Sequence, residues 1–318
     1  MKRVQLTEDR LVDLRYDKIF KAVFTQETEA SRKALRSLLE ATLQRSLDIV
    51  TVIANEPAAQ SATDRQIRYD IACTFNSGEL ANIEMTLWPK GGEPFRIEYF
   101  LSRLFASQDI RGREFSELKR SYQISILGDK LYRDRHAVHS FEYYDQDQGI
   151  ALGGLTSVIT LELEKLEELV EKPLEAVSGQ ERWGLFLRYA AEPERLNLVN
   201  RLLEMEEGIA MAGEAILELP QSQVEEMRRI SRDKYLMDQA QAAYDLRCLT
   251  QERDAVMQER DAIAQERDTV AQELNTVAQE RDAITRELHM ILQERDSMKK
   301  QLDLVFQELA ELKKQLGK

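Results

Sequence analysis

The sequence predicts an α/β core, followed by a helical segment and a long coiled coil. Three observations support this fold class. Helix-like and strand-like spacings of apolar residues alternate up to about residue 163, residues 164–248 have an acidic amphipathic helical pattern, and residues 251–313 repeat every seven residues. We therefore predict a core over residues 1–163, a helical segment over 164–248 and a heptad-repeat coiled coil over 249–318.

The elements of the core follow from the spacing of its apolar residues. Residues 11–45 have the three- and four-residue spacing of helices, and residues 47–54 are β-branched and predict a strand. Residues 68–91 predict a two-stranded hairpin, and a helix is expected from about Phe95 to Phe115. Further strands are expected at residues 122–127, 140–144 and 157–163.

The tail consists of nine heptads that contain neither Gly nor Pro. The sixth position of each heptad is apolar. It follows the third position by three residues and precedes the next third position by four, so the third position is a and the sixth is d of a coiled coil. Such a strict period predicts a left-handed supercoil about 95 Å long. Position a holds five arginines and four leucines: Arg253, Arg260, Arg267, Arg281 and Arg295; Leu274, Leu288, Leu302 and Leu309. The long arginine stems reach solvent most easily in a dimer. The repeat predicts homo-oligomerisation, and the alternative is a single solvated helix.

The charge of the chain is uneven. The net charge is −13, yet residues 1–150 contain 22 Lys and Arg against 23 Asp and Glu, so the acidic excess lies in the C-terminal half. No broad basic surface for nucleic acid is evident, although Arg111 and Arg113 are candidate phosphate contacts unless they are ordinary solvated charges. The first residues lack a signal-peptide pattern, no segment has the ~20 apolar residues of a membrane span, and the two cysteines are far apart. A cytoplasmic protein without a membrane partner is expected.

The hairpin RYDIACTFNSGELANIEMTLWPKG, residues 68–91, has one acid on each strand. If the strands pair symmetrically about Ser77, Asp70 lies opposite Glu84, with Cβ atoms about 4.5–5.5 Å apart. Like charges at that distance repel. Either water screens them on a solvent face, or a divalent cation bridges the two carboxylates.

The two faces of this hairpin differ in polarity. One face is apolar and is expected to pack in the core: Tyr69, Ile71, Cys73, Phe75, Ile83, Met85 and Leu87. The other face carries the two acids among small and polar groups, and a helix could partly cover it: Ala72, Thr74, Asn82, Thr86 and Trp88. A metal held on this face would suit phosphoryl chemistry, because it polarises a phosphate oxygen and lowers the pKa of a bound water.

The order of these motifs resembles the bacterial recombination-promoting nuclease and putative transposase family, within the restriction-endonuclease-like PD-(D/E)XK nuclease superfamily. The resemblance covers about residues 11–247 and leaves out the heptad tail. It is carried by YDKIFKAVF (16–24), IRYDIACTF (67–75), IEMTLW (83–88), FRIEYFLSRLFASQDIRGREFSELKRSYQISIL (95–127), VITLELEKL (158–166), ERWGLFLRYAA (181–191) and ISRDKYLMDQAQAAYDLR (230–247).

The resemblance implies a mixed sheet flanked by helices, Mg²⁺-dependent cleavage of DNA and a role in DNA recombination. It implies that Asp70 and Glu84 are metal ligands, with the carbonyl of Met85 as a third, and that Asp17 and Lys21 support the site. It further implies that residues on the helix after the hairpin approach phosphate: Arg96, Tyr99 and Gln108.

The chain departs from the family pattern at Thr86. The superfamily has Lys at this position and the family usually has Gln, which positions the attacking water. A threonine hydroxyl is shorter and uncharged, and losing such a donor costs about 10²–10³ in rate in other enzymes. Lys21, Gln108 or Lys90 could supply the missing group. Two hypotheses follow: a metal-dependent DNA endonuclease whose activity is weakened by Thr86, or an inactive nuclease-derived module that self-associates and binds DNA or protein.

Overall fold

The computed structural model describes residues 4–48, 50–53, 68–76, 78–89 and 91–317, so Ser77 and Lys90 lie outside the described residues. The chain divides into two compact units, Met1–Leu236 and Met237–Lys318. The first unit contains a sheet and its flanking helices, and the second consists of the greater part of one long helix.

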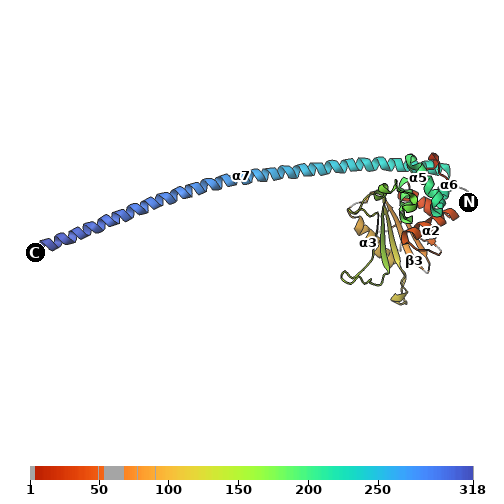
Figure 1. The fold of residues 1–318 in the computed structure, drawn as a ribbon, viewed down its shortest axis with the longest axis horizontal. Coiled ribbons are helices and arrows are strands. Elements are labelled where there is room, and N and C mark those ends of the chain that lie inside the picture. Colours follow the sequence, from red (N-terminus) through yellow and green to blue (C-terminus); the bar gives the residue numbers. More distant parts are fainter. Residues whose placement is uncertain (1–3, 49, 54–67, 77, 90, 318) are drawn as a thin grey trace. The chain divides into compact units, whose positions relative to one another are not determined.

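The first unit is built on a six-stranded mixed sheet (Figure 1). The strand order is β1-β2-β3-β4-β6-β5. Its first three strands are antiparallel, β3, β4 and β6 are parallel, and β5 runs antiparallel to β6. The bounds are β1 Val50–Val52, β2 Ile71–Phe75, β3 Glu79–Thr86, β4 Ser121–Leu127, β5 Val138–Phe141 and β6 Thr156–Glu162. The predicted α/β core with a mixed sheet is confirmed.

Helices cover both faces of this sheet. Figure 1 shows α2, α5 and α6 together on one side and α3 on the other. The helical pattern expected over residues 11–45 forms two helices, α1 and α2, separated by a short non-helical stretch. Thr28 ends that stretch and caps α2, because its side chain accepts a hydrogen bond from the Ser31 N–H at 3.2 Å. The α-helices are α1 Asp17–Phe24, α2 Glu29–Leu43, α3 Glu93–Ala106, α4 Gly179–Tyr189, α5 Leu196–Met205, α6 Glu207–Glu218 and α7 Gln221–Leu316. Short 3₁₀ segments lie at Glu8–Arg10, Phe115–Glu117, Leu163–Leu169, Leu174–Ala176 and Pro193–Arg195.

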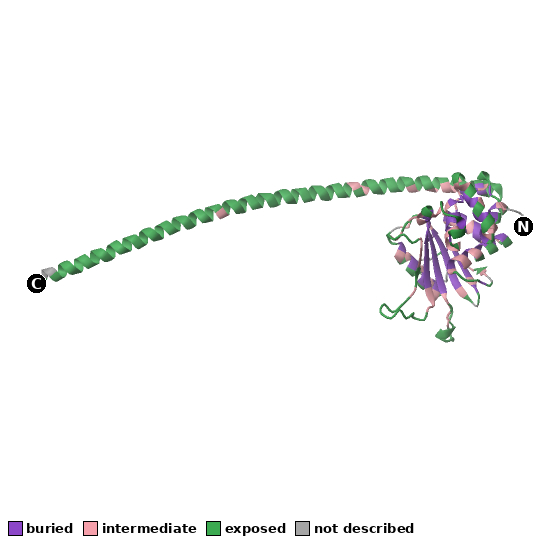
Figure 2. Cartoon of the chain, viewed as in Figure 1, coloured by how far each residue is buried: buried purple, intermediate pink, exposed green. Residues whose placement is uncertain are grey.

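The main hydrophobic core lies between one sheet face and the helices α1, α2 and α4 to α6 (Figure 2). The apolar face predicted for the hairpin supplies the strand side of this core, through Ile71, Cys73, Phe75, Ile83 and Met85. Aromatic side chains from the helices fill it: Phe20, Phe24, Trp183 and Phe186. Each such side chain contributes on the order of 1.5–3 kcal/mol on burial, so this core holds the strands of the acid-bearing hairpin in place.

The opposite face of the sheet is partly covered by α3, which agrees with the mixed polarity of that face. Two small apolar clusters form the contact: Tyr69, Ala72, Leu80 and Leu104; Ile97, Leu101 and Val158. Tyr69 was expected on the core face and that expectation is wrong. It precedes β2, and its ring packs edge-on against Phe100 of α3 with the ring centroids 5.8 Å apart. This packing fixes α3 above the face that carries the acids.

Helix α3 ends at Ala106, well before the expected Phe115. The residues that follow, SQDIRGRE, are polar and include Gly112, whose φ of 74° a helix does not permit. Gln108, Arg111 and Arg113 therefore lie in the connection to β4 and not on the helix. The strand expected at residues 140–144 is also displaced, to Val138–Phe141, and Tyr144 forms only an isolated bridge with Ala151.

The heptad tail is helical throughout, within α7. Its apolar side chains are exposed in the single chain, as for Val256 at 64% and Leu274 at 72% (Figure 2). The predicted helix is confirmed, and its supercoiling with a partner remains a prediction. None of the described helices combines the length and apolar character that a membrane crossing requires.

Candidate active site

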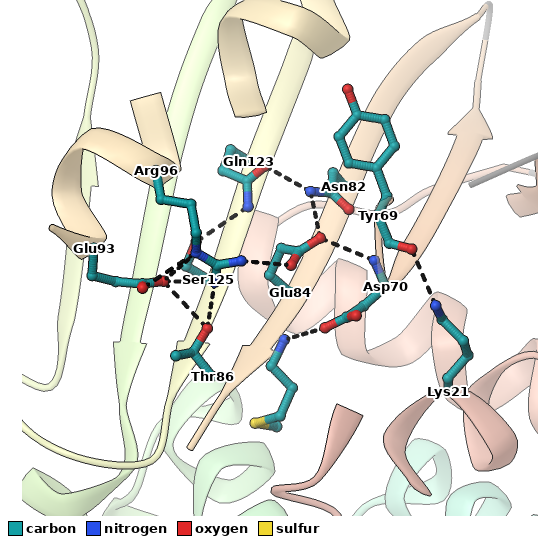
Figure 3. A network of polar contacts seen from close by, with 11 residues as sticks. Lys21, Tyr69, Asp70, Asn82, Glu84, Thr86, Glu93, Arg96, Gln123 and Ser125 are labelled. Carbon is teal, nitrogen blue, oxygen red and sulfur yellow. Dashed lines mark hydrogen bonds and ion pairs between the residues drawn. The ribbon is translucent and has the colours of Figure 1, made fainter. Parts of the chain in front are cut away.

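The two acids of the hairpin meet on neighbouring strands. Pairing of Ile71 with Ile83 and of Ala72 with Asn82 matches the predicted register, and it sets Asp70, just before β2, opposite Glu84. The Asp70 N–H donates to Glu84 Oε1 at 2.9 Å (Figure 3). In return, the Met85 N–H donates to Asp70 Oδ2 at 3.0 Å. Each carboxylate is thus oriented by the backbone of the other strand.

Burial and mutual repulsion change how these acids ionise. Burial first, and then the charge of Asp70, raise the pKa of Glu84 to about 7. Burial likewise raises the pKa of Asp70, against the lowering effects of the Met85 N–H and of the charge on Lys21. A pair that resists double ionisation near neutral pH attracts either a proton or a cation.

Polar side chains on β3 and β4 support Glu84 from one side. Asn82 donates to Glu84 Oε1 at 3.0 Å and to Gln123 Oε1 at 2.8 Å, and Gln123 Nε2 donates to Ser125 Oγ at 3.2 Å. Parallel pairing of β3 with β4 places Asn82 beside Gln123 and Glu84 beside Ser125. Because all these side chains are buried, their hydrogen bonds hold Glu84 in one orientation.

Thr86 belongs to a second cluster, formed with the first turn of α3. Arg96 Nη2 donates to Thr86 Oγ1 at 2.6 Å and to Glu93 Oε1 at 2.7 Å, and Thr86 Oγ1 is 3.2 Å from Glu93 Oε1 (Figure 3). Arg96 Nη1 also lies 3.4 Å from Glu84 Oε2. The side chain of Glu93 is 7% exposed, so Arg96 is the counter-charge of two buried carboxylates. Arg96 thereby joins Thr86 to the acid pair.

The two supporting residues on α1 have different surroundings. Lys21 Nζ donates to the Tyr69 carbonyl at 3.1 Å, which places its charge next to Asp70. Asp17 Oδ1 instead lies 3.2 Å from Nζ of Lys234, in the N-terminal part of α7, and both side chains are nearly half exposed. Lys21 is therefore part of the acid cluster, whereas Asp17 forms an ion pair with Lys234 near that cluster.

The remaining predicted DNA contacts lie apart from this network. The side-chain amide of Gln108 is bonded to the backbone of Lys119, with its Oε1 accepting at 2.8 Å and its Nε2 donating at 2.9 Å. Arg111 pairs with Asp109 at 3.0 Å on the surface. Tyr99 and Arg113 are exposed. The structure therefore brings Arg96 to the acids, while Gln108 closes the loop after α3.

Sequence reasoning missed Glu93, Gln123 and Ser125. Gln123 and Ser125 had a visible signal, because they alternate with Tyr122, Ile124 and Ile126 in a short strand that is otherwise apolar. Polar residues at alternate positions of a strand buried on both faces need partners, and the acid pair is such a partner. Glu93 had no signal, because its place depends on how α3 docks on the sheet.

The donor set fits a divalent ion that keeps several of its own ligands. Among the described residues, no group of three or more His, Cys, Asp and Glu side chains is placed to hold a metal. Two carboxylates, each with an oxygen outside the reciprocal backbone hydrogen bonds, suit Mg²⁺, which commonly binds one or two carboxylates together with water and substrate phosphate. The Met85 carbonyl, next to Glu84 in sequence, is the further candidate ligand.

Comparison with known proteins gives the family. Residues 14–245 match the PD-(D/E)XK nuclease family transposases, and the match includes both acids, Thr86 and all of α3. No curated protein and no solved structure matched the chain. Nucleases of the PD-(D/E)XK type generally use divalent metal ions, in agreement with the carboxylate pair. The chain belongs to the PD-(D/E)XK nuclease family transposases.

Proposed function

We propose that this protein is a metal-dependent DNA endonuclease that acts in DNA recombination, with Asp70 and Glu84 holding Mg²⁺. Family membership supports the reaction class. The observation that carries the proposal is the reciprocal hydrogen bonding of the two acids, Asp70 N–H to Glu84 and Met85 N–H to Asp70. These hydrogen bonds hold two mutually repelling carboxylates next to each other, and a divalent cation bound between them would stabilise that arrangement.

The chain's own residues have distinct roles in this proposal. The metal, when bound, supplies polarisation of the scissile phosphate and a bound water of lowered pKa. Asp70 and Glu84 would hold it, and the Met85 carbonyl would be a third ligand. Burial raises the pKa of Asp70, and the nearby charge of Lys21 partly offsets that rise and so favours the ionised carboxylate that a metal needs. The buried amides of Asn82 and Gln123 keep Glu84 in a fixed orientation.

Arg96 supplies a positive charge near the position where the family pattern has Lys or Gln. Its guanidinium contacts the Thr86 hydroxyl and lies beside Glu84, and its side chain is 37% exposed. An arginine there can pair with a phosphate oxygen and stabilise charge that develops during cleavage. The Thr86 hydroxyl orients Arg96 and does not act as a base.

A plasmid-nicking assay tests the function. The intact chain is expected to nick supercoiled plasmid with Mg²⁺ or Mn²⁺, and Asp70→Asn and Glu84→Gln should each remove the activity. Glu98→Gln, an exposed glutamate on α3, is the control and should nick normally. Nicking that survives in either acid variant would contradict the proposal.

Restoring the family's side chain at position 86 should raise activity. Thr86→Gln is expected to increase the nicking rate by about 10²-fold, because a longer amide can orient water and still contact Arg96 and Glu93. Thr86→Lys is the poorer choice, since its charge would lie against that of Arg96. Thr74→Gln, on the same face at the turn end of the hairpin, should have no such effect. Nicking rates at saturating Mg²⁺ measure the difference, and an unchanged Thr86→Gln rate would count against a role for this position.

Metal affinity should depend on pH through Glu84. The pKa of this carboxyl is about 7 without metal, and a metal ligand must be deprotonated. Affinity is therefore expected to be constant above pH 8 and to fall by about tenfold for each pH unit below 7. Titration of Mn²⁺ at pH 8 and pH 6, followed by electron paramagnetic resonance of the free ion, measures this. Equal affinities at the two pH values would contradict it.

A second candidate function is a nuclease-derived module that binds DNA or protein without cutting. The observation that favours it is Thr86 at the third motif position, held with Arg96 against Glu93. This alternative expects no nicking under any divalent metal. Gain of nicking in Thr86→Gln alone would show that the scaffold kept its metal site and lost only this position.

We also infer that the heptad tail joins copies of the chain. The apolar a and d side chains are exposed along the described part of the tail, and a partner helix would bury them. Deleting residues 251–318 is expected to reduce the mass in solution to that of one chain, measured by light scattering. An unchanged mass after deletion would assign the association to another surface.

A further inference from the structure

Eight of the nine heptads of the tail carry Glu at position g, directly before position a. These glutamates are Glu252, Glu259, Glu266, Glu273, Glu280, Glu287, Glu294 and Glu308. Position g flanks the apolar seam, and its charges choose the partner helix and its direction. Such a uniform row of one charge restricts how two tails can associate.

Within one helix these glutamates have no cation at the spacings that allow contact. Side chains three or four residues away from position g are at c and d, which hold almost only uncharged residues. In the described tail, every ion pair joins an arginine at a to the aspartate that follows it, as Arg253 to Asp254 at 2.6 Å. None of those pairs includes a glutamate at g. The charge of this row is therefore left for a partner.

The direction of the partner decides what the row meets. In an antiparallel pair, position g of one helix faces position g of the other, so Glu would lie opposite Glu along nearly the whole tail. In a parallel, in-register pair, position g faces the partner's position a and its position e five residues further on. The partner's Arg253, Arg260, Arg267, Arg281 and Arg295 then lie next to glutamates.

Position e agrees with the parallel arrangement. Two lysines occupy it, Lys299 and Lys313. They lie five residues after Glu294 and Glu308, which are the positions that a parallel partner brings into contact with them. The other e residues are uncharged, so the glutamates meet no negative charge at this position: Met257, Ala264, Ala271, Ala278, Thr285, Leu292 and Phe306.

We propose that two copies of the chain pair through residues 251–313 as a parallel, in-register coiled coil, in which glutamates at g contact arginines at a and lysines at e of the partner. The proposal rests on the self-association inferred above and adds its direction and register. Arg at a in five heptads favours two strands, because a guanidinium reaches solvent from a two-stranded seam. Leu at a with Val or Ile at d, which favours more strands, is limited to the other heptads.

Parallel pairing has a consequence for the nuclease. Both copies of the first unit are joined to the same end of the coiled coil, since each enters it from residue 251. Each dimer therefore contains two Asp70–Glu84 pairs, carried by units that are joined to the same end of the coiled coil, and two such sites suit cleavage of both strands of a duplex.

Cysteine cross-linking in the full chain tests direction and register. With Cys248→Ser as background, Leu302→Cys should oxidise to a covalent dimer, because equivalent a positions adjoin in a parallel pair. A mixture of Arg260→Cys and Val305→Cys chains should form no heterodimeric cross-link, whereas an antiparallel pair would join them. A heterodimeric cross-link without the Leu302→Cys dimer overturns the direction. A mass of one chain overturns the association itself, and a mass of four overturns the two-stranded seam.

A matched pair of charge variants tests the direction of pairing independently. Glu259→Gln with Glu266→Gln removes glutamates next to arginines, and should raise the dimer dissociation constant by about tenfold. Glu273→Gln with Glu287→Gln removes glutamates next to leucines, and should change the constant less than twofold. Sedimentation at several concentrations measures both. In an antiparallel pair each double variant would relieve repulsion, so tighter dimers from both would overturn the proposal.

Discussion

Glu84→Gln is expected to stabilise the folded protein at pH 8 in EDTA by about 1–3 kcal/mol while removing Mg²⁺-dependent nicking. The folded state raises the pKa of this carboxyl from 4.5 to about 7. Between these values the folded state binds more protons than the unfolded state, so stability falls as pH rises through the window. Above pH 7 the whole penalty remains, on the order of 3 kcal/mol, and glutamine removes it. The lost contact with Arg96 offsets part of the gain.

The loss of activity has a separate cause, because glutamine cannot ligate the metal as a carboxylate does. Several kcal/mol of lost metal stabilisation corresponds to about 10³-fold in rate. Urea unfolding at pH 8 and pH 5 measures the stability, and the advantage of the variant should shrink at pH 5. Glu98→Gln should be neutral at both pH values. A Glu84→Gln protein less stable than the parent at pH 8 would contradict the electrostatic account of this pair.

Arg96→Met is expected to destabilise the protein by about 1–3 kcal/mol and to lower nicking by about 10²–10³-fold. The substitution leaves the buried carboxylates of Glu93 and Glu84 without their counter-charge. Solvent screening limits the loss of stability, because the Arg96 side chain is 37% exposed. Adding Glu93→Gln should recover most of the lost stability, since one of the unpaired charges is then gone.

Two comparisons separate this effect from a general loss of charge. Arg111→Met removes an arginine whose side chain is 92% exposed and should change stability by less than about 0.5 kcal/mol. A double-mutant cycle for Glu93 and Arg96, measured by urea unfolding, gives their coupling directly. Additive effects of the two substitutions would contradict the cluster that joins Thr86, Glu93 and Arg96.

The geometry of the acid pair was predictable because it depends on local rules. The Asn-Ser-Gly sequence places a turn between two alternating strands, and its symmetry gives the register that the structure has between Ile71 and Ile83. Gly78, at a φ of 102°, and Asn76, at 49°, supply the left-handed conformations of that turn. The alternation of side chains then places both acids on the face away from the main core.

Contacts made by α3 were not predictable from the sequence. Docking of this helix on β3, β4 and β6 brings Glu93 and Arg96 to Thr86, and it depends on side chains far apart in the chain, such as Leu101 with Val158. The early end of α3 was also missed, because the apolar spacing gave no weight to Gly112. The expectation that Tyr69 faces the main core failed because Tyr69 lies before β2, where strand alternation no longer fixes the direction of the side chain.

The long helix shows the opposite case, in which sequence periodicity alone suffices. A seven-residue repeat without Gly or Pro predicts an uninterrupted helix, and α7 continues through every heptad to Leu316. The exposed seam along the described tail is a property of one helix by itself, whereas the charges at a, e and g indicate which partner would cover it.

Calorimetric titration of Mg²⁺ into the full chain at pH 8 tests the central claim most directly. The account predicts one site per chain that disappears in both Asp70→Asn and Glu84→Gln and persists in Glu98→Gln. Unchanged Mg²⁺ binding in either acid variant, or no binding to the parent chain, would contradict it.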